Sequence, residues 1–400
     1  MEITLFEARK LILASQGLLN KKPFGKGKRA VLKVLDRLGY VQIDAISVIE
    51  RAHHHTLWNR AGNYKPGLLY AMLGRDRTVL EYWSHAAAFL PMKHYRFCLH
   101  TMHHIKSAGH HWYPVDTQVK TYVYDRIVGE GALYARDFGG NGKLSGKMWD
   151  LKPAKQALHE LFMEGKLLVS ARDNFHRRYD LPERVLPSGI DTSLPAPREQ
   201  AAYYLLSAIK AQGLVSLGAI HYLRNWIKPL IQQYLPEFIE EGKILQVTIH
   251  KSSGKVFYTT PDRIEQMPKR VNKAVYLLSP FDNAIIQRKR LAYFFNFDYQ
   301  TEIYLPAHKR VYGYFALPIL WGTEFIGRLD PKAVRKTGVL VINNLQIEPR
   351  VKINDQLLWA LKNALHDFAL FNGCESFQIS KSEPAFLTAW LSKPSDIGAP

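Results

Sequence analysis

One short pattern, in which a predicted helix stops at a glycine and a strand follows at once, recurs in this chain. The segment 164–166 (Glu-Gly-Lys) precedes an apolar run at 167–169, and the segment 241–243 (Glu-Gly-Lys) precedes a similar run at 244–247. The segment 37–41 (Arg-Leu-Gly-Tyr-Val) is a fainter third copy. Glycine after the last helical residue ends a helix, and a short aliphatic run favours a strand. The recurrence therefore predicts tandem copies of one small α+β unit.

The sequence around two of these copies has the order of a winged helix. Residues 153–164 have helical spacing, begin with a proline and precede two short strands around the turn 172–174. Residues 201–209 carry one apolar helix face, and a later helix precedes strands at 244–249 and 256–259. Helix, strand, turn and strand is the winged-helix order, so we predict winged helices in both regions.

The chain divides into four predicted blocks, namely 1–115, 116–190, 191–268 and 269–400. The first is helix-rich, and the second and third contain the two clearer winged helices. The fourth has short strands bounded by Gly, Pro and Asn, including one at 302–305, and a single helix with an apolar stripe at 358–368. The expected fold class is α+β, with three tandem winged-helix motifs and a small C-terminal β-barrel or sheet.

Charge indicates the kind of partner. Lys and Arg number 54 against 35 Asp and Glu, a formal net charge of +19, which favours a polyanion, nucleic acid before an anionic membrane. No apolar stretch is long enough to span a bilayer, and two distant cysteines make no disulfide framework. We expect a monomer in the cytoplasm, associated with the nucleoid.

Common cofactor and metal motifs are missing from the sequence. There is no phosphate-binding loop with a Gly-Lys-Ser/Thr ending, no dinucleotide fingerprint and no His-Glu-x-x-His. His53, His54 and His55 are adjacent, but consecutive helical residues point about 100° apart and cannot share one ion. We therefore expect no metal or cofactor at these histidines, and phosphate contact or an orienting role is the better functional interpretation.

The segment Gln42-Ile43-Asp44 is the first catalytic candidate. In an extended chain, residues two apart share a face, so Gln42 and Asp44 would project together while Ile43 turns into the core. A carboxylate beside an amide can hold and activate one water molecule. The simpler alternative is that Asp44 caps a helix that follows it.

The run Glu81-Tyr82-Trp83-Ser84-His85 combines an acid, two aromatic rings and a histidine. Such a run can line a nucleobase pocket, and it can equally pack at a junction between domains. The residues alone leave both interpretations open.

Several of these segments, together with others, resemble signatures of the winged-helix DNA glycosylases, the AlkZ/YcaQ group. They occur in the expected order over nearly the whole chain: Gln42-Ile43-Asp44, Ile49-Glu50-Arg51-Ala52, Glu81 to His85 with Pro91, Ser279-Pro280-Phe281-Asp282, Glu302-x-Tyr304 with Pro306, the segment 309–315 (Lys-Arg-Val-Tyr-Gly-Tyr-Phe) and Gly327-Arg328-Leu329-Asp330.

The resemblance implies excision of N-alkylated purines from double-stranded DNA by tandem winged helices and a C-terminal β-barrel around a DNA channel. One branch of the group carries Gln-x-Gln at the catalytic position, and the other, associated with unhooking interstrand crosslinks, carries Gln-x-Asp. Gln42 and Asp44 match the second branch. We therefore expect a monofunctional hydrolase for N7-alkylated purines, in which Asp44 stabilises the sugar cation and deprotonates a water held by Gln42.

The predicted DNA- and lesion-binding residues come from the same segments and from the wing of the second winged helix. They are Arg51, His53, His54, His55, Tyr82, Trp83, His85, Arg172, Arg177 and Arg178.

Two rival functions remain open on the sequence alone. A winged-helix regulator without catalytic activity would read base edges of undamaged DNA. A metal-dependent nuclease would use paired acids such as Asp173 and Asp180, although charged residues on a wing usually face solvent.

Overall fold

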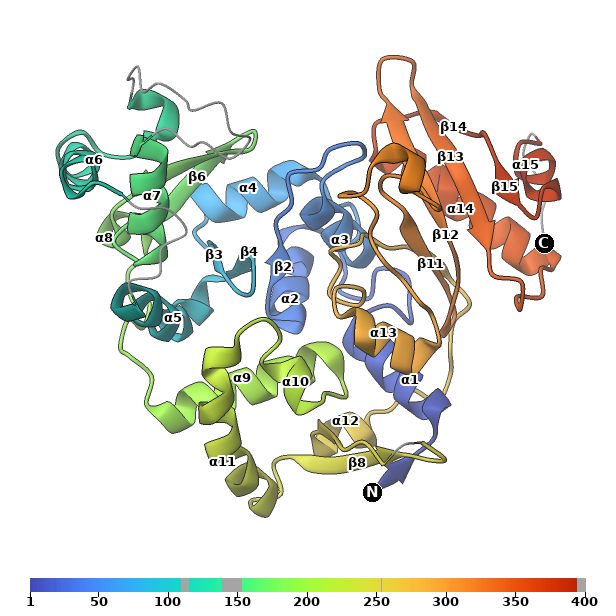
Figure 1. Cartoon of the computed structure of the whole chain (residues 1–400), viewed down its shortest axis with the longest axis horizontal. Helices are drawn as coiled ribbons and strands as arrows, with labels where there is room; N and C mark the ends of the chain where they lie inside the picture. Colours follow the sequence, from blue (N-terminus) through green and yellow to red (C-terminus); the bar gives the residue numbers. More distant parts are fainter. Residues whose placement is uncertain (109–114, 139–152, 253, 394–400) are drawn as a thin grey trace.

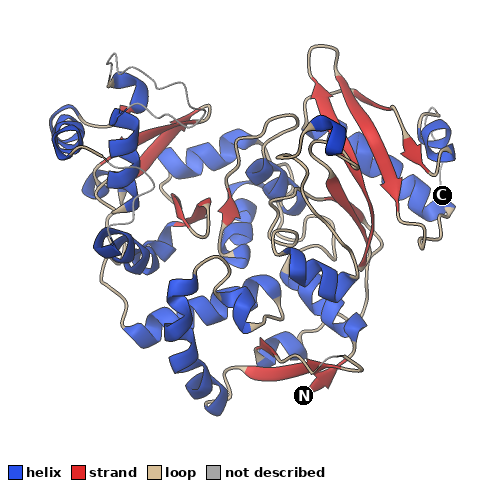
Figure 2. Cartoon of the chain, in the orientation of Figure 1, coloured by secondary structure: helices blue, strands red, loops and turns tan. Residues whose placement is uncertain are grey.

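The computed structural model describes residues 1–108, 115–138, 153–252 and 254–393. Helices and small sheets alternate along the chain, and the larger C-terminal sheet lies to one side of them (Figures 1 and 2). The described strands form three sheets of three strands and one sheet of six strands. The α+β class is therefore confirmed.

The first small sheet has the order β2 (Val41–Gln42), β4 (Ala87–Pro91) and β3 (Val79–Trp83). It packs with four helices, which are α2 (Gly27–Leu38), α3 (Ala52–Arg60), α4 (Pro66–Gly74) and α5 (Tyr95–Ala108). Helix α2 ends at Gly39, whose φ of +76° is the left-handed conformation that glycine adopts without strain. Strand β2 follows two residues after this turn.

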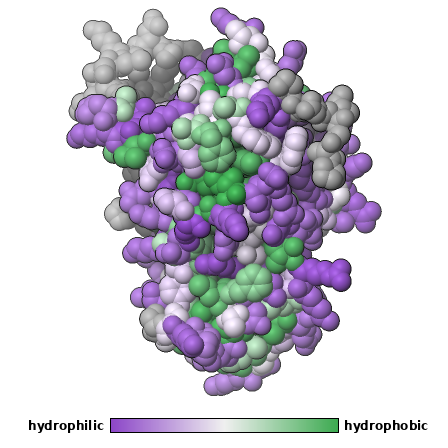
Figure 3. Space-filling view, turned by 90° about the vertical axis from the view of Figure 1, so that its right-hand side faces the viewer, coloured by the Kyte–Doolittle hydropathy of each residue, from purple (hydrophilic) through white to green (hydrophobic). Residues whose placement is uncertain are grey.

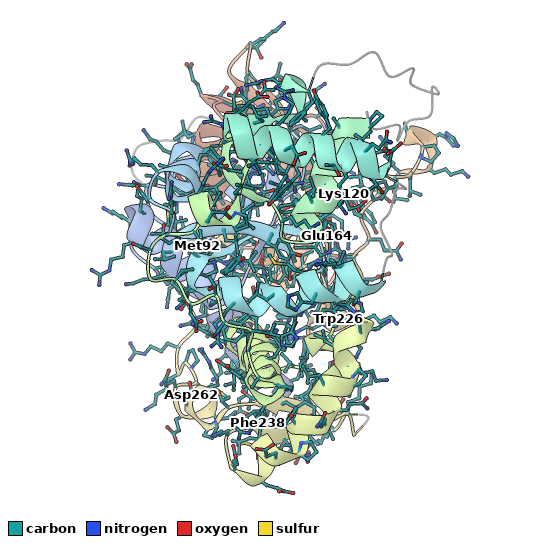
Figure 4. The ribbon with its side chains drawn as sticks, turned by 90° about the vertical axis from the view of Figure 1, so that its left-hand side faces the viewer. Met92, Lys120, Glu164, Trp226, Phe238 and Asp262 are labelled. Carbon is teal, nitrogen blue, oxygen red and sulfur yellow. The ribbon has the colours of Figure 1, made fainter. Side chains whose placement is uncertain are left out.

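The second small sheet has the order β5 (Leu133–Tyr134), β7 (His176–Asp180) and β6 (Leu168–Asp173). Helices α6 (Thr117–Glu130), α7 (Pro153–Met163) and α8 (Pro182–Val185) accompany it. Lys120 on α6 donates hydrogen bonds to Glu160 and, at 2.8 Å, to Glu164 near the end of α7. Figure 4 shows Lys120 and Glu164 close to each other on this face.

The third small sheet joins the chain's beginning to its middle. Strand β1 (Glu2–Ile3) pairs in parallel with β8 (Leu245–Ile249), which pairs with β9 (Phe257–Thr259). Four helices precede β8 or follow β9: α9 (Pro197–Gln212), α10 (Leu217–Ile220), α11 (Lys228–Glu240) and α12 (Pro261–Glu265). Helix α1 (Leu5–Ser15) also packs here, so residues 1–19 share a core with the third and fourth predicted blocks rather than with the rest of the first.

In each small sheet, one strand follows a helix that is terminated by a glycine with positive φ: β2 follows Gly39, β6 follows Gly165 and β8 follows Gly242. Gly165 after α7 and Gly242 after α11 have φ of +75° and +68°, close to the value at Gly39. The three predicted helix–glycine–strand junctions are present. The assignment of each unit as a winged helix stays a prediction.

The C-terminal sheet has the order β10 (Val275–Leu277), β11 (Leu317–Trp321), β12 (Glu324–Val334), β13 (Val339–Ile347) and β14 (Ser376–Ile379). Strand β15 (Ser382–Glu383) also pairs with β13, and α13 (Arg288–Phe295) and α15 (Phe386–Leu391) flank the sheet. Helix α14 (Asp355–Phe371) packs on one face through its apolar stripe.

Of the predicted barrel or sheet, the sheet is confirmed and the barrel is wrong, because α14 covers the face that a barrel would enclose and no described strand joins β10 to β14. The prediction of a single helix in this block is also wrong, because α13 and α15 accompany α14. The predicted strand at 302–305 is also absent, because this segment belongs to a loop organised by the Glu302 side chain.

Across the described ranges, no helix has the length and apolar character needed to cross a membrane. The face on the C-terminal side intersperses hydrophilic and hydrophobic side chains (Figure 3).

Candidate active site

The segment Gln42-Ile43-Asp44 lies on β2 and just beyond it, at the edge of the first small sheet. Gln42 pairs with Ala88 of β4, and the Ile43 N–H donates to the Ala87 carbonyl oxygen at 2.8 Å. Ile43 is buried, whereas Gln42 and Asp44 are half-buried. The predicted alternation is confirmed: the amide and the carboxylate lie on the opposite face of the extended chain from Ile43.

Asp44 does not cap a helix, so that alternative is wrong. Its Oδ1 atom accepts the Ile46 N–H at 2.8 Å in a local turn, and the next helix, α3, begins only at Ala52. Burial raises the pKa of the Asp44 carboxyl above its ordinary value, and the Ile46 N–H and the charge of Arg51 offset this only in part. A carboxylate with a raised pKa is a better proton acceptor than an ordinary one.

Gln42 is held by a histidine from the turn between β3 and β4. The Nε2 atom of His85 lies 3.1 Å from the Oε1 atom of Gln42. Burial, followed by the charge of Arg224, lowers the pKa of His85 to about 4, so the ring is neutral at pH 7. With the amide oxygen as acceptor, His85 donates through Nε2, and the Gln42 NH₂ group is directed elsewhere.

His85 also lines a cleft between the first small sheet and α9. Rings from both sides meet there, and His85 makes edge contacts with Tyr40 and Tyr222 at ring-centre distances of 5.2 and 5.4 Å. Trp83 and Arg224 line the same cleft. Sequence reasoning missed Tyr40, Tyr222 and Arg224. Only Tyr40 carried a signal, because it stands two residues before Gln42 on the same extended segment.

Some side chains of the segment 81–85 lie in the protein interior and others line the cleft. Trp83 and His85 line the cleft, and their role as lesion-binding residues stays a prediction. Tyr82 is fully buried and its hydroxyl donates to the Met163 carbonyl oxygen at 2.7 Å, so its prediction as a lesion-binding residue is contradicted. Its ring belongs to the core between the first and second small sheets.

Glu81 binds two of the three predicted DNA-binding arginines of β6 and β7. It is fully buried and accepts two hydrogen bonds from Arg172, at 2.6 and 2.7 Å, and one from Arg177. Burial alone would raise the pKa of Glu81, but the charges of Arg177 and Arg172 lower it overall. Arg172 and Arg177 therefore fasten the second small sheet to the first, and this contradicts their role as free phosphate ligands. Arg178 is exposed and stays a predicted DNA contact.

The three histidines of α3 are also interior residues. His54 bonds Tyr64 at 2.7 Å and Tyr70 at 3.1 Å, while His55 packs against Phe368 with ring centres 4.8 Å apart. Burial lowers the pKa of all three, to about 3 for His54 and about 4 for His55. Phosphate binding by His53, His54 and His55 is contradicted, because neutral buried rings cannot reach a phosphate.

Arg51 stands between these histidines and the catalytic candidate. It is half-buried, and its guanidinium carbon lies 4.5 Å from the centre of the Phe175 ring in the turn between β6 and β7. Its Nε atom is buried and has no hydrogen-bond partner among the residues that the structure describes. Arg51 therefore stays a predicted DNA-binding residue, with a charge close enough to Asp44 to lower the pKa of that carboxyl.

Within the described ranges, no group of three or more His, Cys, Asp or Glu side chains is placed to hold a metal ion. Asp173 pairs with Arg136 at 3.0 Å and Asp180 with Arg184 at 3.4 Å, so the two acids of the nuclease alternative are engaged separately.

Comparison with known proteins gives the same assignment as the signatures. A model of the family described as DNA glycosylase AlkZ-like matches residues 35–371. Streptomyces sahachiroi DNA glycosylase AlkZ has a similar structure, with a TM-score of 0.64 and 14% sequence identity over 95% of this chain and 100% of that one. The likeness between the structures shows a common fold, and the family match covers most of the chain, Gln42 and Asp44 included. The chain belongs to the AlkZ-like DNA glycosylase family.

Proposed function

We propose that this DNA glycosylase hydrolyses the N-glycosidic bond of N7-alkylated purines, including those in interstrand crosslinks, through Asp44 and Gln42. The observation that carries the proposal is a half-buried carboxylate with a raised pKa, on the same face of one extended segment as an amide. No cofactor or metal enters the proposed chemistry.

The reaction begins from a base that is already a good leaving group. Alkylation at N7 gives the purine a positive charge, so the base leaves as a neutral molecule with the electron pair of the N9–C1′ bond. Ionised Asp44 stabilises the developing positive charge on the sugar and takes a proton from the attacking water, whose oxygen bonds to C1′. The products are the free base and an abasic site, with both strands intact.

An open site suits a crosslinked substrate. A crosslinked base is tied to the opposite strand and cannot rotate freely into a deep pocket. Neither Gln42 nor Asp44 is among the residues that line the aromatic cleft, although His85 connects Gln42 to it. This position supports chemistry at the edge of the sheet rather than at the bottom of the cleft.

The test uses two duplexes of one sequence, one with N7-methylguanine and one with an N7-linked crosslink. The full chain should release the methylated base and unhook the crosslink, leaving abasic sites that alkali converts to strand breaks. Breaks without alkali would contradict monofunctional hydrolysis. Tight binding to a preferred undamaged sequence, with no excision, would favour the regulator.

Excision should depend on pH through Asp44. The carboxylate works only when ionised, so the single-turnover rate should fall as pH falls through a pKa above the usual value of about 4 for aspartate. The measurement is the excision rate from pH 4 to 8, with the uncatalysed loss of base subtracted at each pH. A rate that stays constant down to pH 4 would contradict the role of Asp44 as a base.

Affinity should depend on salt through exposed cations such as Arg178. The Arg178→Ala variant should bind duplex DNA more weakly and lower the slope of log K against log salt concentration by about 1. The Arg198→Ala variant is the control, because Arg198 is already paired with Glu237 and Glu241. Fluorescence anisotropy from 50 to 300 mM salt gives the slopes, and equal slopes for the two variants would remove Arg178 from the interface.

A further inference from the structure

A loop between α13 and β11, residues 303–312 and called here the Tyr304 loop, exposes apolar side chains in an unusual concentration. Tyr304 is 83% exposed, Val311 67% and Leu305 41%. Scattered apolar residues on a surface need no explanation, but three within eight positions of one loop do. None of the excision chemistry above uses them.

The end of the same loop is held in place by the side chain of Glu302. The buried carboxylate of Glu302 accepts the backbone N–H groups of Val311, Tyr312 and Gly313 at 3.1, 2.8 and 3.0 Å. At Gly313, φ is +130° and a Cβ atom would lie 2.3 Å from the Asp330 side chain, so only glycine fits. Because the backbone of this loop is already fixed, binding a partner through its exposed side chains costs little further backbone entropy.

Two further contacts close the loop. The Arg310 Nε donates to the Leu305 carbonyl oxygen at 2.8 Å, and the Asn344 side chain donates to the Tyr312 carbonyl oxygen at 3.2 Å. Arg310 is thereby occupied, whereas His308 and Lys309 are exposed. The segment 303–312 has no Asp or Glu, so the exposed apolar groups are accompanied only by basic ones.

The position of the loop relates it to the catalytic candidate. Tyr314, just after the loop, and Ile46 and Val48, just after Asp44, pack against the same core cluster of the C-terminal sheet. The Ala333 N–H of β12 donates to the Val48 carbonyl oxygen at 2.8 Å, which fixes the segment after Asp44 to that sheet. The chain segments next to the Tyr304 loop and next to Asp44 are therefore both fixed to the C-terminal sheet.

We infer that the Tyr304 loop is a wedge for duplex DNA, with Lys309 on a phosphate and Tyr304 and Val311 against bases that are partly unstacked. Proteins that distort DNA insert apolar side chains between base steps, and an aromatic ring stacks on a base of any sequence. The basic and apolar composition fits this ligand better than an apolar protein partner. The inference rests on the proposed function only in taking DNA as the ligand.

The test measures binding in the Asp44→Asn background, so that turnover does not interfere. Two duplexes of one sequence are compared by fluorescence anisotropy, one intact and one with a stable abasic-site analogue. The Tyr304→Ala variant should lose about 5-fold to 100-fold affinity for the distorted duplex and much less for the intact one. The Lys309→Ala variant should weaken binding to both duplexes equally and lower the salt slope by about 1.

Phe386→Ala is the matched control, because Phe386 is a 50% exposed apolar residue on α15. A 2-aminopurine beside the abasic analogue reports unstacking directly: its fluorescence should rise when the protein with Tyr304 binds and rise less with Tyr304→Ala. If Tyr304→Ala equals Phe386→Ala on both duplexes and in this signal, the wedge is wrong. Since these readouts need no excision, absence of glycosylase activity in the wild type would contradict the proposed function separately.

Discussion

Replacing Asp44 by asparagine is expected to lower the rate of base excision by about 10²- to 10⁴-fold, the range that general bases contribute. Asparagine has no charge with which to stabilise the sugar cation and cannot accept a proton from water. The alkylated base still leaves slowly by itself, so activity should fall to a low residual rate. Single-turnover excision of N7-methylguanine measures the loss.

The fold of this variant should survive, because the structural role of Asp44 needs only an oxygen. The Oδ1 atom of asparagine can still accept the Ile46 N–H. Folding raises the pKa of this carboxyl, so the ionised form opposes folding at pH values above that pKa, and removing the charge should cost no stability at pH 7. The midpoint of thermal unfolding and the affinity for DNA should therefore stay close to those of the wild type.

Asp116→Asn is the matched control. Its Oδ1 atom also accepts a backbone N–H two residues ahead, from Gln118 at 2.7 Å, at the start of α6. Asparagine caps a helix as well as aspartate does, so this variant should be fully active. If Asp44→Asn were as active as Asp116→Asn, another group would have to perform the hydrolysis.

Sequence reasoning succeeded where a property depends on neighbours along the chain. The faces of Gln42 and Asp44 follow from the two-residue period of an extended segment, and the helix ends at Gly39, Gly165 and Gly242 follow from the conformational freedom of glycine. These features need no knowledge of the rest of the fold.

The same reasoning failed where burial is decided by distant partners. The sequence around Glu81 and Tyr82 is compatible with a pocket, but partners from another predicted block bury both side chains. Arg172 and Arg177 bind Glu81, and the Met163 carbonyl oxygen accepts the Tyr82 hydroxyl. The residues near Glu81 in the sequence do not indicate that two arginines, 91 and 96 positions later, bind its carboxylate. The aromatic cleft has the same origin, because Tyr222 and Arg224 reach it only in the folded chain.

The segments that resemble the glycosylase family include residues with a proposed catalytic role and residues with a structural role. Gln42 and Asp44 are half-buried, as the proposed catalytic role requires, whereas Asp282 of the segment 279–282 is fully buried. The Asp282 carboxylate accepts hydrogen bonds from both terminal nitrogens of Arg60, at 2.7 and 2.8 Å. The Nε atom of Arg60 also donates to the Gln16 carbonyl oxygen. This pair connects the end of α1, helix α3 and the segment between β10 and α13, which is a structural role that a motif alone does not distinguish from catalysis.

Asp282→Asn should therefore destabilise the whole protein by about 3–5 kcal/mol, the usual cost of breaking a buried ion pair from one side. The substitution preserves shape but leaves the guanidinium of Arg60, which is fully buried, without a counter-charge. The midpoint of thermal unfolding should fall by several degrees. Arg198→Ala breaks the exposed ion pairs to Glu237 and Glu241 and should change that midpoint little.

A double variant separates the two causes of this loss. Arg60→Met together with Asp282→Asn removes the buried cation, so it should recover part of the stability lost in Asp282→Asn, although the Gln16 and Thr56 carbonyl oxygens lose a donor. If the double variant were less stable than Asp282→Asn, the hydrogen bonds of Arg60 would outweigh the penalty of its uncompensated charge. Arg60 would then stabilise the junction as a donor to three segments, and the ion pair would be the smaller part of its contribution.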